Sequence, residues 1–241
     1  MRLTFLLFAS IMGAFAQGTN MDGQVFLFAT RSATNYVTLK QDVTTLTGFT
    51  ACVRAFTELT AGFSYLSCNS PSQDNNLLLF HRNSKENPYA VHVGGPETPF
   101  RSTSSPPLDR YHICGTWDSF TGVVQMFLNG KPLARKVMKK GYSIQGPLKC
   151  ILGQEQDSFG GKFDINQSFV GEIDNVHVWD YVLSPADIHQ AFMNNKHLNG
   201  NVISWWNLWY DITGDVLVEP VQQSHCDNQA CCESSPRCKT N

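Results

Sequence analysis

A segment between residues 155 and 167 gathers many of the oxygen-bearing side chains of this chain. It carries three carboxylates, from Glu155, Asp157 and Asp164, together with side-chain amides and two adjacent glycines. Hard oxygen donors at close, irregular spacing suit a calcium ion, and glycine lets the backbone bend around it. The segment contains no thiol or imidazole, so zinc and copper fit it poorly. The residues alone leave a calcium site and a polar surface loop as alternatives.

A second segment carries a more specific signature. Residues 111–119 read Tyr-His-Ile-Cys-Gly-Thr-Trp-Asp-Ser, which fits the pattern His-x-Cys-x-Ser/Thr-Trp-x-Ser/Thr of the pentraxin family. Residues 151–161 resemble the calcium loop of the same family, and the two motifs occur in the right order. From about Gln24 to about Pro220 the chain therefore resembles a short pentraxin.

The resemblance implies a function. It describes a secreted, calcium-dependent, lectin-like pattern-recognition protein of innate immunity and the acute phase, with no catalytic activity. Such a protein binds phosphocholine-type ligands on microbial or damaged-cell surfaces as a homo-oligomer, which we expect to be a pentamer. Recruitment of complement components is a further expectation. The alternatives are a relative that binds phosphoethanolamine or anionic sugars, and a laminin-G-like adhesion module that holds calcium.

The resemblance also assigns two calcium ions to each subunit. The first ion is expected to bind Asp74, Asn75, Glu155, the main-chain carbonyl of Gln156, and Asp157. The second is expected to take Glu155, Asp157, Asp164 and Gln167. Four carboxylates would then face four positive charges, and without metal these carboxylates would repel one another.

The contacts for the organic ligand follow from the same resemblance. Phe80 and Glu97 fall where phosphocholine-binding pentraxins place their choline contacts, and His92 lies between them in the sequence, where it can line the same site. A ring face packs on the methylammonium group, and a carboxylate meets its positive charge.

The start of the chain predicts export. Arg2 precedes an apolar run, residues 3–15, that is too short to span a bilayer, and a small-x-small cleavage pattern ends at Ala16. We therefore expect a signal peptide at 1–16, a pentraxin domain at 17–220 and a cysteine-rich tail at 221–241. No later apolar run predicts a membrane span. The formal net charge of −2 gives no general attraction to nucleic acid.

All eight cysteines follow the predicted signal peptide, and secretion makes disulfides the default. The resemblance pairs Cys52 with Cys114. Our hypothesis is that Cys68 and Cys150 also pair, which would tie the two proposed ligand segments together. For the tail we expect disulfides rather than a zinc site, because the cysteine spacing does not fit a zinc knuckle; its cysteines are Cys226, Cys231, Cys232 and Cys238.

One glycosylation sequon, Asn166-Gln167-Ser168, lies inside the proposed calcium loop. Asn166 is therefore a glycosylation candidate. A glycan there would lie beside the proposed ligand Gln167.

Strands must position these residues. Segments such as 24–28, 49–56, 111–118 and 123–128 are short and rich in Val, Phe, Tyr and Thr, and Asn129-Gly130 is a hairpin turn signal. They predict an all-β fold, a two-sheet antiparallel jelly-roll sandwich. Ser184 and Pro185 begin one short helix, expected near residues 185–194.

An enzyme of the jelly-roll glycoside hydrolase type is the remaining alternative. Such enzymes use a Glu-x-Asp-x-x-Glu strand, in which two glutamates act as nucleophile and acid. Glu172 and Asp174 match this pattern, but His177 occupies the position of the second glutamate. The missing acid argues against hydrolysis.

Overall fold

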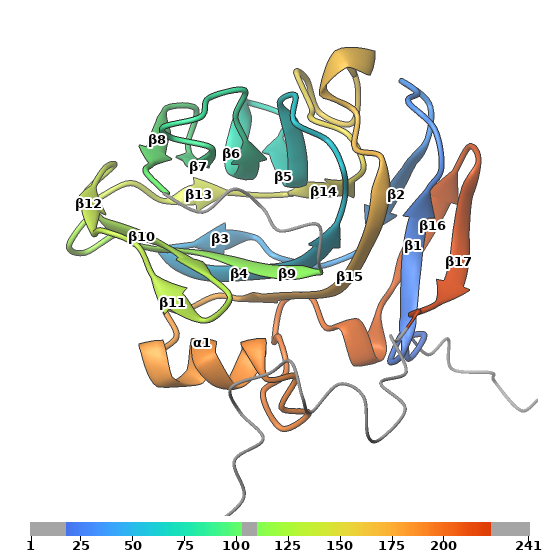
Figure 1. Ribbon diagram of the computed structural model, residues 1–241. Helices are drawn as coiled ribbons and strands as arrows, with labels where there is room; N and C mark the ends of the chain where they lie inside the picture. The colour runs from blue at the N-terminus through green and yellow to red at the C-terminus, as the bar shows by residue number, and fades with distance from the viewer. Residues whose placement is uncertain (1–17, 103–109, 223–241) are drawn as a thin grey trace, which may run out of the picture.

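The computed structural model describes residues 18–102 and 110–222. The predicted signal peptide and the four tail cysteines lie outside these residues. Within them, two antiparallel sheets face each other, and one α helix lies on the outer side of one sheet (Figure 1). The predicted all-β sandwich is therefore confirmed. No helix in the described ranges is long and apolar enough to cross a membrane.

The first sheet has the strand order β11-β10-β9-β4-β15-β1-β17, with β12 also paired to β10. Its strands are β1 (Gln24–Phe28), β4 (Gly48–Phe56), β9 (Tyr111–Asp118), β10 (Val123–Leu128), β11 (Lys131–Pro132), β12 (Lys136–Val137), β15 (Gly171–Trp179) and β17 (Val216–Pro220).

The second sheet carries the candidate site and has the order β16-β2-β14-β5-β6-β7-β8. Its strands are β2 (Tyr36–Leu39), β5 (Phe63–Ser70), β6 (Gln73–His81), β7 (Tyr89–Val93), β8 (Glu97–Phe100), β14 (Lys149–Leu152) and β16 (Tyr210–Thr213). A separate pair is formed by β3 (Thr45–Leu46) and β13 (Ile144–Gln145). Two 3₁₀ turns, η1 (Ile165–Gln167) and η2 (Trp205–Asn207), lie in the connections.

The core lies between the two sheets. Phe49, Ala51, Val53 and Ala55 of β4 are all buried in the main core cluster, as their alternation with polar neighbours predicts. Cys52, on the opposite face of the same strand, belongs to a second cluster. The period of two therefore separates a core face from an outer face on each strand.

Helix α1 (Pro185–Phe192) covers the outer face of the first sheet (Figure 1). The hydroxyl of Ser184 accepts a hydrogen bond from the backbone N–H of Asp187, so the predicted cap is present. Ile188 packs against the Cys52–Cys114 disulfide in the second cluster. The helix ends two residues before the expected position, because Asn194 takes a left-handed φ of 59° that stops the helical turn.

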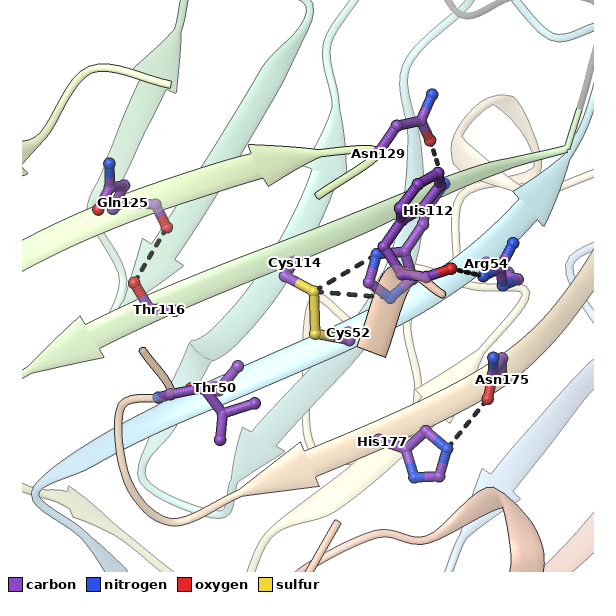
Figure 2. Close-up of a disulfide and its surroundings, with 12 residues drawn as sticks. Thr50, Cys52, Arg54, His112, Cys114, Thr116, Gln125, Asn129, Asn175 and His177 are labelled. Atoms are coloured by element: carbon purple, nitrogen blue, oxygen red, sulfur yellow. Dashed lines mark hydrogen bonds between the residues drawn. A yellow bond between two sulfur atoms is a disulfide. The ribbon is translucent and has the colours of Figure 1, made fainter. Parts of the chain in front are cut away.

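Two disulfides each join residues that lie directly opposite on neighbouring strands. Cys52 on β4 bonds Cys114 on β9, and Cys68 on β5 bonds Cys150 on β14. Both expected pairings are therefore present. The first lies under the outer face of the first sheet (Figure 2), and the second lies next to the candidate site.

Candidate metal centre and its neighbourhood

The loop that begins at Glu155 folds around the side chain of Gln156, which is fully buried. Its amide nitrogen donates to the backbone carbonyls of Ser67, at 2.7 Å, and Lys149, at 2.9 Å. Its amide oxygen accepts from the backbone N–H of Gly160 at 2.8 Å. The side chain of Gln156 therefore anchors the loop to β5 and β14 from inside, between the buried Glu155 and the exposed Asp157.

Asn69, a fully buried residue of β5, holds the two proposed ligand segments together. Its Nδ2 donates to the main-chain carbonyl of Gln156 at 2.7 Å, and its Oδ1 accepts from the backbone N–H of Asn75 at 2.7 Å. The neighbouring residue, Cys68, ties β5 to β14 through its disulfide. Sequence reasoning missed Asn69; the signal was an amide beside a cysteine in an otherwise buried strand.

The structure brings most of the proposed carboxylate ligands close enough to interact. Glu155 is only 4% exposed, whereas Asp74, Asp157 and Asp164 are exposed. Burial, reinforced by the negative charges of Asp157 and Asp74, raises the pKa of Glu155 to about 7. The Asn75 side chain, hydrogen-bonded to Glu155, acts in the opposite direction. Within the described ranges none of these four carboxylates forms an ion pair.

Asn75 tests whether this site fits a cation. Its backbone takes a left-handed φ of 48°, which asparagine tolerates better than most residues. Its Oδ1 is buried and has no hydrogen-bond partner among the described residues. An orphaned amide oxygen beside a buried, uncompensated carboxylate is the donor set that a hard cation such as calcium satisfies. The residues present therefore fit the expected metal.

The spacing of the carboxylates shows how much the site must adjust. Oxygens bound to one calcium ion lie within about 5 Å of each other, because each Ca–O distance is about 2.3–2.6 Å. Among the described residues, only Cys52, His112 and Cys114 place three ligand-type atoms within 4.8 Å of one another. That group is no metal site, since both sulfurs belong to the disulfide. A cation would therefore have to draw the carboxylates inward.

The remaining proposed ligands lie on the η1 turn. Asp164 caps this turn, accepting from the backbone N–H of Asn166 at 2.9 Å, and the backbone N–H of Gln167 donates to the Asp164 carbonyl at 2.9 Å. The Gln167 side chain is half-buried. Both residues are thus held at the far end of the same loop.

A second group of polar side chains lies on the outer face of β6, β7 and β8. We call Phe80, Arg82, His92 and Glu97 the β6–β8 cluster. His92 is paired in register with Glu97, and the rings of Phe80 and His92 meet edge to face with centroids 6.2 Å apart. The three predicted ligand contacts therefore do come together.

Arg82 is the member of this cluster that sequence reasoning missed. Its guanidinium lies 3.2 Å from Glu97 Oε1 and also donates to the Asn87 carbonyl at 3.2 Å. The expected choline carboxylate is therefore already ion-paired. No sequence motif predicts this ion pair, because Arg82 follows β6 and reaches Glu97 across β7.

The turn between β7 and β8 connects the cluster to the metal segment. The backbone N–H of Gly95 donates to the Asn75 carbonyl at 3.1 Å, and that of Gly94 donates to the Asn76 carbonyl at 3.1 Å. His92 Nδ1 lies 3.2 Å from the Gly95 carbonyl oxygen. These hydrogen bonds hold the β6–β8 cluster next to the segment of Asn75 and Asn76, so that one ligand can contact both.

Comparison with known proteins decides the family. The model of the Pentaxin family matches residues 24–220. The chain is 44% identical over 216 residues to mucosal pentraxin of Rattus norvegicus, which spans 89% of this chain and 94% of that protein. It is 42% identical over 221 residues to C-reactive protein of Homo sapiens, spanning 90% and 96%. The chain belongs to the pentraxin family.

A solved structure agrees with this assignment at the level of fold. A heptameric serum amyloid P-like pentraxin from Limulus polyphemus superposes with a TM-score of 0.77 at 23% identity, covering 84% of this chain and 97% of that one. Family membership favours the pentraxin interpretation of this sandwich over the laminin-G type.

The side chains of the sequon residues Asn166 and Ser168 form hydrogen bonds within the loop of this pentraxin. Asn166 is exposed, and its Nδ2 donates to Asp164 Oδ1 at 3.0 Å. Ser168 is buried, and its hydroxyl donates to the Ile165 carbonyl at 2.7 Å. Glycosylation at Asn166 stays a prediction; a glycan would replace one hydrogen on the nitrogen that now contacts a proposed calcium ligand.

The residues that resembled a hydrolase strand have other partners. Glu172 and Asp174 are both ion-paired with Arg110. His177 is 4% exposed and lies 3.0 Å from Asn175 Oδ1 through its Nε2 (Figure 2). Burial lowers the pKa of His177 to about 4. Neither carboxylate is left free to act as a nucleophile or an acid, which argues against the hydrolase alternative.

Proposed function

We propose that this pentraxin is a secreted, calcium-dependent binding protein without catalytic activity, which recognises phosphorylated ligands of the phosphocholine class. The observation that carries the proposal is Glu155, a buried carboxylate near three like charges, beside an Asn75 oxygen that has no hydrogen-bond partner in the described part of the chain. Such a group is costly without a cation.

The residues fall into two proposed calcium sets. Asp74, Asn75, Glu155, the Gln156 carbonyl and Asp157 hold the first ion. Glu155, Asp157, Asp164 and Gln167 hold the second. When bound, calcium supplies open coordination positions that accept phosphate oxygens.

The β6–β8 cluster supplies the second half of the ligand site. Phe80, which is half-buried, offers a ring face for methylene or methylammonium groups, and Glu97 offers a negative charge. A single small ligand of this kind binds modestly, because little of its surface is buried.

Oligomerisation raises the effective affinity. The Limulus relative is described as heptameric. We propose a homo-oligomer, with five subunits as the expected number, whose sites engage a repetitive microbial or damaged-cell surface by avidity. Complement recruitment from such an assembly belongs to the same innate-immune proposal.

Secretion is supported by the two disulfides, which persist in oxidising compartments. The signal peptide at 1–16 stays a prediction, since it lies outside the described residues.

The test is calcium stoichiometry followed by ligand capture. Equilibrium dialysis should give two calcium ions per subunit. The protein should bind immobilised phosphocholine only in calcium and elute with chelator and with free phosphocholine. One ion per subunit would favour an adhesion module, and no calcium effect in either assay would refute the site.

A further inference from the structure

The β6–β8 cluster presents both charges to a ligand. Glu97 is 40% exposed at its side chain, and Arg82 is 28% exposed beside it. Arg82 donates one of the five N–H groups of its guanidinium to the Asn87 carbonyl and is ion-paired with Glu97. A quaternary ammonium needs only the carboxylate, so the arginine is an unfavourable neighbour for choline.

His92 carries a second, independent signal. Its Nδ1 lies 3.2 Å from the Gly95 carbonyl oxygen, a contact that requires hydrogen on Nδ1. Burial lowers the pKa of His92, so the ring is neutral near pH 7 and Nε2 keeps its lone pair. That Nε2 is buried and has no hydrogen-bond partner among the described residues.

The lone pair of His92 Nε2 favours a primary ammonium over a trimethylammonium group. Glu97 Oε2 lies 3.7 Å from His92 Nε2, and the exposed Glu97 side chain can move aside. A primary ammonium placed between them can donate an N–H to each. The trimethylammonium of choline has no N–H and leaves Nε2 unsatisfied, at a cost typical of a buried polar atom.

We infer that the β6–β8 cluster recognises the zwitterion of a serine phosphate ester whose amino and carboxylate groups are both free. Glu97 and His92 bind the ammonium, Arg82 binds the carboxylate as a charge-assisted pair, and Phe80 packs on the methylene. This inference rests on the proposed calcium site, which would hold the phosphate. The same chemistry occurs in free O-phosphoserine and in a phosphatidylserine headgroup.

The experiment measures three soluble ligands by calorimetry on the full chain in calcium. We expect O-phosphoserine to bind more tightly than phosphoethanolamine, and phosphocholine to bind most weakly. The first and last should differ by about tenfold or more, the effect of one charge-assisted hydrogen bond. Phosphoserine inside a peptide, whose amino and carboxyl groups are amides, should lose the advantage.

Matched variants separate the roles. Arg82→Ser should lower the affinity for O-phosphoserine to that for phosphoethanolamine. Lys85→Ser, which removes an exposed charge from the same β6–β7 connection, should leave the affinity for O-phosphoserine unchanged. Arg82→Lys should retain part of the preference. His92→Phe should narrow the gap between phosphoethanolamine and phosphocholine. Melting in EDTA checks that each variant folds; if Arg82→Ser does not, the wild-type ranking alone decides.

The outcomes are distinct. Phosphocholine binding as tightly as O-phosphoserine, or an unchanged ranking in folded Arg82→Ser, would overturn the inference while leaving the calcium site intact. Failure of all three ligands together with no effect of calcium on melting would refute the proposed function itself. Vesicles with and without phosphatidylserine identify the source: capture supports a lipid headgroup, and binding of the free ester alone supports the soluble form.

Discussion

Two acidic clusters lie on opposite sides of this sandwich, and they neutralise their charge differently. On the outer face of the first sheet, Glu172 and Asp174 are ion-paired with Arg110, and the positive charge of Arg54 also attracts Asp174. We call these four residues the arginine-paired cluster. Beyond the second sheet, the loop cluster of Asp74, Glu155, Asp157 and Asp164 has no ion pair in the described part of the chain.

Burial alone does not explain the difference. Asp174 is 5% exposed and Glu155 is 4% exposed, and burial raises the pKa of both. For Asp174 the two arginines oppose that shift, whereas for Glu155 the neighbouring aspartates reinforce it. The arginine-paired cluster balances its charge with its own side chains, and the loop cluster is the one for which we propose a cation from solution.

The largest expected effect comes from breaking the arginine-paired cluster. Arg110→Ala would leave Asp174 buried and without its nearest cation, which should cost about 3–5 kcal/mol. Urea unfolding measures this loss, and it should be the same in EDTA and in calcium. Lys40→Ala, which removes the exposed pair with Asp211, should cost less than about 1 kcal/mol. An equally small loss for Arg110→Ala would remove the contrast.

In the loop cluster, one substitution should have opposite effects on stability without calcium and with calcium. Glu155→Gln removes a buried, repelled charge, so it should stabilise the fold in EDTA by about 2 kcal/mol at pH 8. In calcium at about 100 times the dissociation constant, wild type should gain about 2.7 kcal/mol, most of which the variant should lack. Thermal melts in both buffers test this. If Glu155→Gln were more stable than wild type by the same amount in EDTA and in calcium, the loop cluster would not bind calcium.

Asn69→Ala sharpens the comparison by loosening the loop without changing its charge. It removes the donor to the Gln156 carbonyl and the acceptor for the Asn75 N–H, at a cost of about 1–2 kcal/mol. Because the ligand segments are then less fixed, calcium affinity should fall as well. Asn129→Ala, on the first sheet, removes the acceptor for the His112 N–H and should lower stability without changing calcium affinity. Equal calcium affinity in both variants would assign Asn69 a structural role only.

The smallest effect is a pH response beside the arginine-paired cluster. Burial lowers the pKa of His177 to about 4 and of His112 to about 3, the latter helped by Arg54. The folded protein keeps both rings neutral, while the unfolded chain takes up protons below about pH 6.5. Each histidine should therefore lower stability by about 0.7 kcal/mol between pH 7 and 6, while Glu155, whose raised pKa is about 7, acts in the opposite direction when calcium is absent. Urea unfolding of His177→Gln in EDTA should show a shallower slope, and an unchanged slope would contradict the shift.

The sequence predicted what is encoded locally. The alternation along β4, the cap at Ser184 and the position of the 155–167 loop each depend on neighbouring residues, and the two central disulfides followed from family resemblance and loop position. Asn69 and Arg82 were missed because their partners lie far along the chain or on another strand. The only local sign of Asn69 was an amide beside a cysteine in a buried strand, and the partly exposed Arg82 carries no local sign of the carboxylate that it will meet.

Strands β6, β7 and β8 show a further consequence of the period of two. Leu77, Leu79, Val91 and Phe100 point into the core, while Phe80, His92 and Glu97 alternate with them on the outer face. The same three strands thus hold two interleaved sets of residues with separate tasks. If the outer set binds the ligand as we propose, varying it alone should change the ligand preference and leave the fold untouched, so new specificities would need very few substitutions.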